Sequence, residues 1–514
     1  MKRASLVSQT TLNRIYQEVG EAWNRSQFQA AIELLENARR RDPANVRILL
    51  DLGRMYGQRY DYAAAERCFE KAVSFSPKKS ETLDMAGRLS AEFARQEMAE
   101  QFFRRAAGEK DASPETMARL AGIYERLRRN EDAAHLLEQA LQRDGNCALA
   151  RLIRARLHRQ AGQLEEAERT LHPGLVSSTG EVRIHFCYEQ GAILDRQGRY
   201  DEAMAAFLEA KALQAPQVPP LLAQRQAVTA YWKVMQAKFT DEIFKRWTDL
   251  NPALQPAGRL AFLGGFPRSG TTLLEQVLDS HSDIISAEET PVFYDNALAP
   301  LRWKLPPNAD MVAVLDAAQN DDLQQSRKRY FQTMELHLGQ PIRNRLLIDK
   351  NPPNNFLIPA FIRIFPEIKL LIALRDPRDV CLSCFMQAHL PLSKGSVAFV
   401  SLENSFDAYA ETMGFVRLLQ PMIKDRCLEV RYEDMVEDLE PVARKTLDFL
   451  GVPWEAKVLG FDAHARKKTV RSPTYADVTQ PVYKRARGRW HHYRKFLEPH
   501  LEKLEPFIKA FGYE

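Results

Sequence analysis

A glycine-rich turn near the middle of the chain carries residue types that bind an anion. The segment Gly264–Thr272 reads GGFPRSGTT and follows a short apolar run, Arg259–Leu263. The residues after it, Leu273–Asp279, have the composition of a helix. A strand, a tight turn and a helix start together present backbone N–H groups and the positive end of a helix to an anion. We therefore expect a phosphate-binding loop, with Arg268 supplying its positive charge.

The turn differs from the loop of nucleoside triphosphatases at one position. Its spacing, Gly265-x-x-x-x-Gly270-Thr271-Thr272, matches that loop, but Thr271 stands where those enzymes carry a lysine. Because that lysine neutralises the charge of the β- and γ-phosphates, its absence argues against an ordinary ATPase or GTPase. A P-loop kinase with an unusual loop remains an alternative, and it predicts a preference for ATP.

The run Pro267–Thr272 resembles the 5′-phosphosulfate loop of sulfotransferases, which use 3′-phosphoadenosine 5′-phosphosulfate. Three further segments of the chain appear in the order that this family has. The resemblance implies a sulfonate-transferring enzyme whose loop cradles the phosphosulfate. The loop residues to which it assigns this role are Arg268, Ser269, Gly270, Thr271 and Thr272.

The second segment, Leu370–Ser383, begins as an apolar strand that ends at Arg375. Ser383 follows eight residues later, on the helix after the strand. An arginine and a hydroxyl that converge in this way suit a terminal phosphate dianion. The resemblance implies that Arg375 and Ser383 bind the 3′-phosphate of the nucleotide. The alternative is an ion pair at the strand end, between Arg375 and Asp376 or Asp379.

The third and fourth segments lie nearer the C-terminus. Leu428–Met435 is similar to a family strand whose tyrosine can lie near the adenine, which makes Tyr432 a nucleotide contact or a packed strand-end residue. The later segment resembles the part of the family that closes over the nucleotide. Thr474 falls near a serine that contacts the phosphosulfate, and Arg487 and Arg489 belong to a cationic patch that could clamp an anion.

Sulfonate transfer to a hydroxyl also requires a base and a charge beside the leaving group. The segment Ser286–Thr290 resembles tyrosylprotein sulfotransferases, whose second glutamate in this run is the base, so the resemblance assigns that role to Glu289. A helix-start carboxylate is the structural alternative, and His281 is the rival base. Lys350 ends another apolar strand, where the resembling enzymes have a lysine on the leaving bridging oxygen, beside Arg268.

The acceptor stays open among a peptide tyrosine, a saccharide, a lipid and a small phenol. Pro291 stands where tyrosylprotein sulfotransferases carry an arginine, which puts recognition of acidic peptides in doubt. The alternative function is a catalytically inactive nucleotide-binding scaffold whose repeats bind partner proteins.

Cys381 and Cys384 form a C-x-x-C pair, which raises the possibility of a redox or zinc site. No second cysteine pair or close histidine pair completes such a site in the sequence. We therefore expect packing cysteines on one helical face, and no metal is required by the chemistry.

The first half of the chain repeats itself with a period of 34 residues. Small residues recur at Gly53, Gly87, Ala121 and Ala155. A second series consists of Ala31, Ala65, Ala99, Ala133 and Ala167. Large apolar residues recur at Leu35, Phe69, Phe103, Leu137 and Leu171.

This period resembles the tetratricopeptide repeat, in which small residues on one helix let a second helix pack closely. Six units run from about Glu18 to Gln214. Stacked units form a superhelix, because a single unit cannot bury both of its faces. The resemblance implies a groove for a peptide or protein partner, and packing of the array against the second half is the equal alternative.

We expect an α-solenoid at residues 10–248, a linker at 249–258, and a three-layer α/β sulfotransferase domain with a mainly parallel sheet at 259–514. The chain has 514 residues, of which 45% are hydrophobic and 27% charged, so it is not a disordered protein. A net charge of +5 does not mark a nucleic-acid binder. The polar N-terminus and the absence of a 20-residue apolar run predict a cytoplasmic protein without a membrane span.

Overall fold

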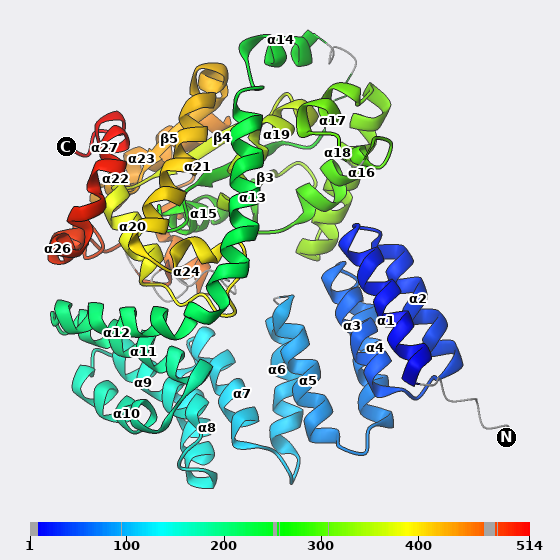
Figure 1. The fold of residues 1–514 in the computed structure, drawn as a ribbon, viewed down its shortest axis with the longest axis vertical. Coiled ribbons are helices and arrows are strands. Elements are labelled where there is room, and N and C mark those ends of the chain that lie inside the picture. Colours follow the sequence, from blue (N-terminus) through cyan, green and yellow to red (C-terminus); the bar gives the residue numbers. More distant parts are fainter. Residues whose placement is uncertain are drawn as a thin grey trace. The chain divides into compact units, whose positions relative to one another are not determined.

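The computed structural model describes residues 9–93, 95–249, 254–255, 257–306, 308–466, 478–480 and 482–514. It divides into two compact units, an N-terminal unit that ends at Thr170 and a C-terminal unit, Leu171–Glu514. The division falls inside helix α10 (Leu164–Ser177) (Figure 1). Half of the expected linker, 249–258, lies outside the described residues, and the domain limits drawn from the sequence stay a prediction.

The N-terminal unit consists of paired helices (Figure 1). They are α1 (Gln9–Asn24), α2 (Phe28–Arg41), α3 (Val46–Gln58), α4 (Tyr62–Phe75), α5 (Lys79–Glu92), α6 (Gln96–Gly108), α7 (Pro114–Arg126), α8 (Asn130–Arg143) and α9 (Ala148–Gln160). The repeated alanines Ala31, Ala65 and Ala99 are completely buried. A Cβ atom on Gly87 would lie 2.7 Å from the ring of Phe103 on the next helix, so only glycine allows this approach. The predicted small-to-large packing is therefore confirmed.

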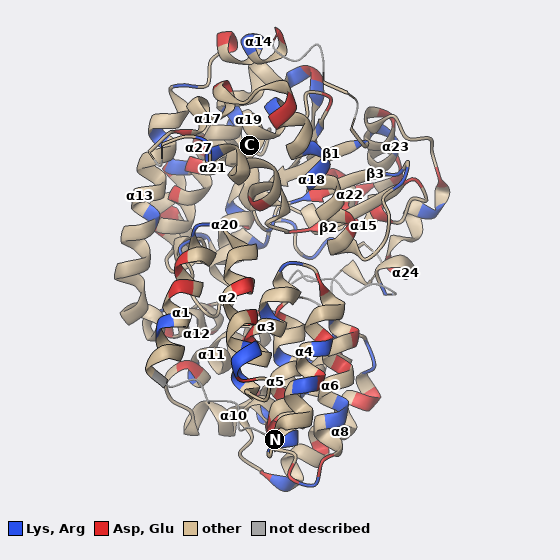
Figure 2. Cartoon of the chain, turned by 90° about the vertical axis from the view of Figure 1, so that its right-hand side faces the viewer, with Lys and Arg blue, Asp and Glu red and all other residues tan. Residues whose placement is uncertain are grey.

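Charged residues of both signs cover the N-terminal unit, as the mixed blue and red on α4, α6 and α8 shows (Figure 2). Some of them pair between successive repeats. Arg119 donates to Asp84 at 2.9 Å, and Arg129 donates to Glu100 at 2.9 Å. The period that buries apolar residues thus also brings opposite charges together on the surface.

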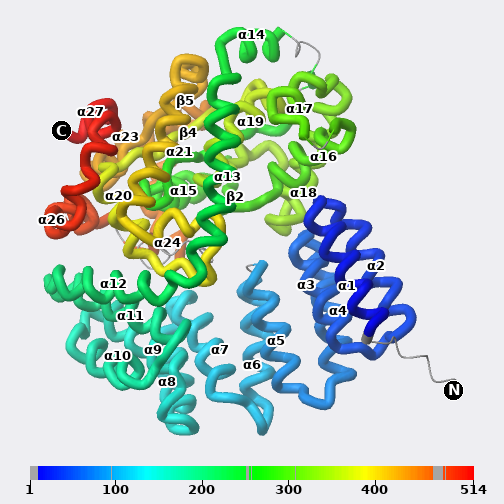
Figure 3. Tube along the Cα trace, in the orientation of Figure 1, coloured from blue at the N-terminus to red at the C-terminus, as the bar shows by residue number. Residues whose placement is uncertain are grey.

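The first complete helices of the C-terminal unit are the last repeat pair, α11 (Gly180–Arg196) and α12 (Tyr200–Gln214), followed by α13 (Val218–Gln236) and α14 (Asp241–Asp249). Lys211 on α12 donates to the backbone oxygen of Phe399 at 2.7 Å. Helix α13 runs beside α21 (Leu402–Ile423) (Figure 3), where the rings of Trp232 and Phe415 lie 6.0 Å apart. The last repeat helices therefore pack in the same compact unit as the sheet.

The sheet has five strands, β1 (Leu260–Gly265), β2 (Ile284–Glu288), β3 (Leu346–Lys350), β4 (Lys369–Leu374) and β5 (Cys427–Arg431). Their order is β2-β3-β1-β4-β5, and every described pair is parallel. The helices around it are α15 (Thr271–Asp279), α16 (Ala299–Arg302), α17 (Met311–Ala317), α18 (Asn320–Leu338), α19 (Ile358–Ile364), α20 (Pro377–Phe385), α21, α22 (Tyr432–Glu437), α23 (Leu439–Leu450), α24 (Phe461–Ala465), α26 (Arg494–Leu497) and α27 (Glu505–Ala510).

Both faces of the central strand β1 are covered. Ala261 and Leu263 belong to a core that includes residues of α15, whereas the ring of Phe262 lies 5.0 Å from that of Phe361 on α19. Alternate residues of a strand point to opposite faces, so this burial requires a layer of helices on each side. The predicted three-layer fold with a parallel sheet is confirmed. No described helix has the length and apolar content needed to span a membrane.

Candidate active site

The carboxyl ends of the five strands carry most of the predicted site residues, on the edge of the sheet where open α/β folds bind ligands. The loop between β1 and α15 turns through left-handed backbone at Gly265, Arg268 and Gly270, with φ of 126°, 72° and 96°. A Cβ atom on Gly270 would lie 2.7 Å from the ring of Tyr432, so the loop requires glycine there. Ser269, within the turn, is buried at 2% exposure.

The predicted threonines, Thr271 and Thr272, form the first residues of α15 and are buried. Their backbone N–H groups therefore belong to the positive end of the helix, which opens onto the loop. This placement is the one that the strand, turn and helix pattern predicts.

Arg268, Ser383 and Arg375 come together although they are distant in sequence. The Nε–H of Arg268 donates to the hydroxyl of Ser383 at 3.0 Å, and Arg375 donates to the backbone oxygen of Arg268 at 3.1 Å. The guanidinium of Arg375 lies 4.9 Å above the ring of Tyr432. Tyr432 is thus placed as a packed support for the loop and the arginine.

The alternative role of Arg375, an ion pair with Asp376 or Asp379, is not supported by short distances. Its guanidinium is 3.9 Å from Asp379, and Asp376 pairs instead with Arg378 at 2.7 Å. Asp379 accepts hydrogen bonds from the backbone N–H groups of Gly488 and Trp490, at 2.7 and 2.8 Å. The carboxylate of Asp379 therefore holds the C-terminal segment.

Lys350 lies at the centre of three carboxylates and is completely buried. Its Nζ is 2.8 Å from Glu289, 3.1 Å from Glu288 and 3.7 Å from Glu275. Burial disfavours the charged amine, but the three carboxylates outweigh it and hold the pKa of Lys350 above its ordinary value. Lys350 is therefore a permanent cation at the site.

Glu289 is the most accessible of these carboxylates, with 47% of its side chain exposed. Its backbone N–H donates to the oxygen of Lys350 at 2.8 Å, and its φ of 49° is left-handed. The rival base His281 is 2% exposed, and both of its ring nitrogens are engaged. Nε2 lies 2.8 Å from the oxygen of Pro453, and Nδ1 accepts from the backbone N–H of Asp283 at 3.0 Å. His281 therefore has a structural role.

Two of the three other predicted nucleotide contacts, Arg487 and Arg489, do not join this group, and the third cannot be placed. Thr474 lies outside the described residues. Arg487 pairs with Glu437 at 3.0 Å on the surface, and Arg489 pairs with Asp195 of α11 at 2.8 Å. The two arginines of the predicted cationic patch thus form ion pairs with two different acidic residues. The sequence contains no local sign of either pairing.

Sequence reasoning missed Glu275 and Asn355. Glu275 is completely buried, and a charged residue between the apolar residues Leu274 and Val277 of α15 is a signal that could have identified it. Asn355 accepts from the N–H of Gly265 at 3.1 Å and donates to its oxygen at 2.7 Å. It fixes the start of the loop, and no motif marks it.

Cys381 and Cys384 lie on the buried face of α20, as expected. The thiol of Cys384 donates to the oxygen of Pro267 at 3.3 Å, and burial raises its pKa to about 12. It therefore packs against the loop as a neutral thiol. Within the described ranges, no group of three or more His, Cys, Asp or Glu residues is arranged to hold a metal ion.

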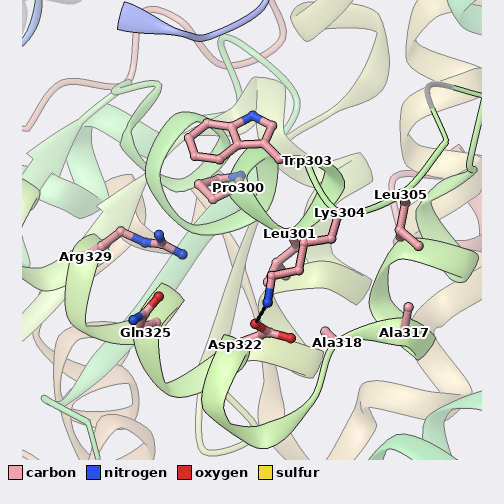
Figure 4. Close-up of a pocket in the computed structure, with 10 residues that line it drawn as sticks. All are labelled: Pro300, Leu301, Trp303, Lys304, Leu305, Ala317, Ala318, Asp322, Gln325 and Arg329. Atoms are coloured by element: carbon pink, nitrogen blue, oxygen red, sulfur yellow. Dashed lines mark hydrogen bonds and ion pairs between the residues drawn. The ribbon is translucent and has the colours of Figure 1, made fainter. Parts of the chain in front are cut away.

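A pocket of about 220 Å³ lies apart from the predicted residues, between α16, α17 and α18 (Figure 4). Lys304 and Asp322 pair across its wall at 2.5 Å, and Trp303 is 59% exposed at its rim. None of the predicted site residues lines it.

Comparison with known protein families finds matches in both halves of the chain. The model of the sulfotransferase family matches residues 261–456, and tetratricopeptide repeat models match residues 16–80, 127–177 and 184–216. The sulfotransferase domain of the olefin synthase of Synechococcus PCC 7002 is 21% identical, covers 47% of this chain and 90% of its own, and has a TM-score of 0.35.

Several relatives share parts of the chain at low identity. An uncharacterized protein of Aquifex aeolicus is 25% identical over 62% of this chain and 41% of its own length. The protein-tyrosine sulfotransferase of Drosophila melanogaster is 28% identical over 45% of this chain and 46% of its own. Protein-tyrosine sulfotransferase 1 of Danio rerio is 28% identical over 45% of this chain and 65% of its own.

The matched segments thus span between 41% and 65% of the length of these relatives. The phosphate-type loop, the strand-end arginine and the lysine–glutamate pair all lie within the matched range. Together with the helical repeats, they show that the chain carries tetratricopeptide repeats followed by a sulfotransferase-family domain.

Proposed function

We propose that the chain transfers a sulfonate group from 3′-phosphoadenosine 5′-phosphosulfate to a hydroxyl or phenol acceptor. The observation that carries this proposal is the contact between Lys350 and Glu289, at 2.8 Å, on the strand edge that also holds the loop of Arg268. A cation for the leaving group and an accessible carboxylate for the acceptor proton thus occur at one place.

The residues of the site suit an anionic nucleotide. Among the predicted nucleotide-binding residues that the structure describes, two donors are buried without a hydrogen-bond partner, the hydroxyl of Ser269 and the Nε–H of Arg375. A buried donor of this kind is costly unless a ligand satisfies it. Ser269 and Arg268 would hold the phosphosulfate, and Arg375 with Ser383 would hold the 3′-phosphate.

The donor supplies an activated sulfonate. The residues of the chain position the donor and the acceptor and neutralise the negative charge of the leaving group. The acceptor oxygen forms a bond to sulfur while the bond between sulfur and the bridging oxygen breaks. Glu289 takes the acceptor proton, and adenosine 3′,5′-bisphosphate leaves with the electron pair. Lys350 and Arg268 offset the charge that develops on the leaving oxygen, which is the principal electrostatic contribution in such displacements.

The backbone of the two central residues supports this assignment. Among the described residues of the C-terminal unit, the non-glycine residues with positive φ are Arg268, Glu289 and Arg343. A left-handed non-glycine residue costs about 1 kcal/mol or more and persists where the surrounding structure imposes it, often at functional sites. Two of these three residues carry proposed roles in the reaction.

For the acceptor, we favour a phenol such as peptide tyrosine, because the relatives are named protein-tyrosine sulfotransferases. Pro291 distinguishes this chain from the arginine of that family, so we expect weaker selection for acidic peptides. We also propose that the repeats bind a peptide or protein partner.

Calorimetric titration with adenosine 3′,5′-bisphosphate tests the nucleotide assignment. We expect micromolar binding that is lost in Arg375→Ala and kept in Arg431→Ala. Arg431 is a matched control because it also ends a strand, but its guanidinium donates to the oxygen of Gly512 at 3.2 Å. A preference for ATP would overturn the proposal in favour of a kinase-like protein.

The base is tested by Glu289→Gln. The change removes the proton acceptor and one negative charge beside Lys350, but Glu275 and Glu288 still surround this lysine. We therefore expect nucleotide affinity not to fall while turnover falls about 10²–10⁴-fold. Glu288→Gln removes the neighbouring carboxylate from the same lysine and should lose less. Retained turnover in Glu289→Gln would remove Glu289 as the base, and a wild-type chain that binds nucleotide without any turnover would support the inactive scaffold.

A further inference from the structure

Helix α11 of the last repeat pair binds the C-terminal segment of the chain through Asp195. This carboxylate accepts from Nε of Arg489 at 3.0 Å and lies 2.8 Å from its Nη2. It also accepts from the hydroxyl of Tyr493 at 2.7 Å. The side chain of Asp195 is 14% exposed and that of Arg489 is 28% exposed, so solvent screens this pair only partly. One repeat residue thus holds both ends of the short helical turn 489–493.

The segment that precedes this turn contacts the predicted 3′-phosphate site. Gly488 and Trp490, on either side of Arg489, donate their backbone N–H groups to Asp379. Two residues before Gly488, the backbone oxygen of Ala486 accepts from Nη2 of Arg375 at 2.5 Å. The segment 486–490 is therefore held by α11 at Arg489 and itself holds the guanidinium of Arg375.

A guanidinium binds phosphate well only when its plane is fixed, because its donors form a rigid fork. The oxygen of Ala486 and that of Arg268 each take one Nη donor of Arg375, which fixes that plane. The first of these acceptors depends on segment 486–490. If this segment moves, the guanidinium of Arg375 therefore loses its fixed orientation.

We propose that Asp195 is a positioning residue for nucleotide binding: through Arg489 it holds segment 486–490, which orients Arg375 toward the 3′-phosphate. The inference rests on the proposed function, because it needs Arg375 to bind that phosphate. It makes the last tetratricopeptide repeat a structural part of the donor site.

The test is calorimetric titration of the full chain with adenosine 3′,5′-bisphosphate. Asp195→Asn should weaken binding about tenfold, since small misplacements of a binding group have effects of this order or larger. Tyr493→Phe removes one of the hydrogen bonds to Asp195 and should weaken binding less. The matched control is Asp201→Asn on α12. Asp201 pairs with Lys495 at 2.7 Å and also links a repeat helix to the C-terminal segment, but both side chains are exposed.

A purely structural role of Asp195 is tested by combining Asp195→Asn with Arg375→Lys, which keeps a cation and a measurable affinity but has no guanidinium plane to orient. If Asp195 acts by orienting the guanidinium of Arg375, its substitution causes no further loss of affinity in the Arg375→Lys background. An equal loss in both backgrounds overturns the inference, as does unchanged binding in Asp195→Asn. If that variant fails to fold, unchanged binding in Tyr493→Phe overturns it. Failure of the wild-type chain to bind the bisphosphate refutes the proposed function itself, which is a different result.

Discussion

Replacing Lys350 by methionine measures how strongly the site depends on one buried cation. Glu275 is completely buried and the side chain of Glu288 is 10% exposed, so both carboxylates lose their counter-charge in a poorly hydrated place. Breaking a buried ion pair by removing one partner costs about 3–5 kcal/mol. Glu289 is 47% exposed and contributes little to this cost, because solvent screens it. We therefore expect Lys350→Met to lower the free energy of unfolding of the C-terminal unit by about 3–5 kcal/mol.

The assay is urea unfolding at pH 8 and pH 5, with wild type beside the variant. Without Lys350, burial and mutual repulsion raise the pKa of the carboxylates Glu275 and Glu288 in the folded state. The folded variant then binds more protons than the unfolded chain, so its stability falls as the pH rises through this range. The loss should be larger at pH 8 than at pH 5, and Lys350→Met with Glu275→Gln should recover part of it. A loss below 1 kcal/mol at pH 8, or one independent of pH, would refute the reasoning.

Four further substitutions have defined outcomes. Burial lowers the pKa of Lys211 from 10.5 to about 7, so the unfolded chain binds more protons between these values and stability rises with pH there. In urea unfolding, the wild type should gain about 2 kcal/mol over Lys211→Met between pH 7 and pH 9. Gly270→Ala places a left-handed alanine against Tyr432, which should cost about 1–3 kcal/mol and weaken nucleotide binding in calorimetry. Gly87→Ala should lower the thermal midpoint through overpacking, whereas Gly20→Ala, in a helix position with nothing within 4 Å, should raise it.

Residues at strand ends could be predicted from the sequence because two short-range patterns coincide there. An apolar run marks each strand, and a charged residue or a glycine-rich turn stands where the run ends. Examples are Arg268, Lys350 and Arg375. Parallel strands place all such residues on one edge of the sheet, so their order along the chain is enough to gather them. The repeat could be predicted for a similar reason, since its period is local.

The partners of surface arginines could not be predicted in this way. Arg487 and Arg489 are two residues apart and look alike in sequence, yet one pairs with Glu437 and the other with Asp195, 294 residues earlier. Which acid each arginine meets depends on how the helices pack, and helix packing is not encoded in a short motif. The same holds for Asn355, whose side chain is defined only by its contacts with the backbone of Gly265.

The limit between repeat and sheet shows why a sequence period and a compact unit need not coincide. The period identifies units through Gln214, because Gly191 and Phe207 still pack as the earlier small and large residues do. The outer face of this last pair is different, since it has no further repeat to cover it. It is covered instead by the rest of the C-terminal unit, through Lys211 to Phe399 and through Asp195 to Arg489. A repeat whose free face carries such partners becomes part of the neighbouring domain while keeping the sequence of an array, so its last helices can support the proposed donor site.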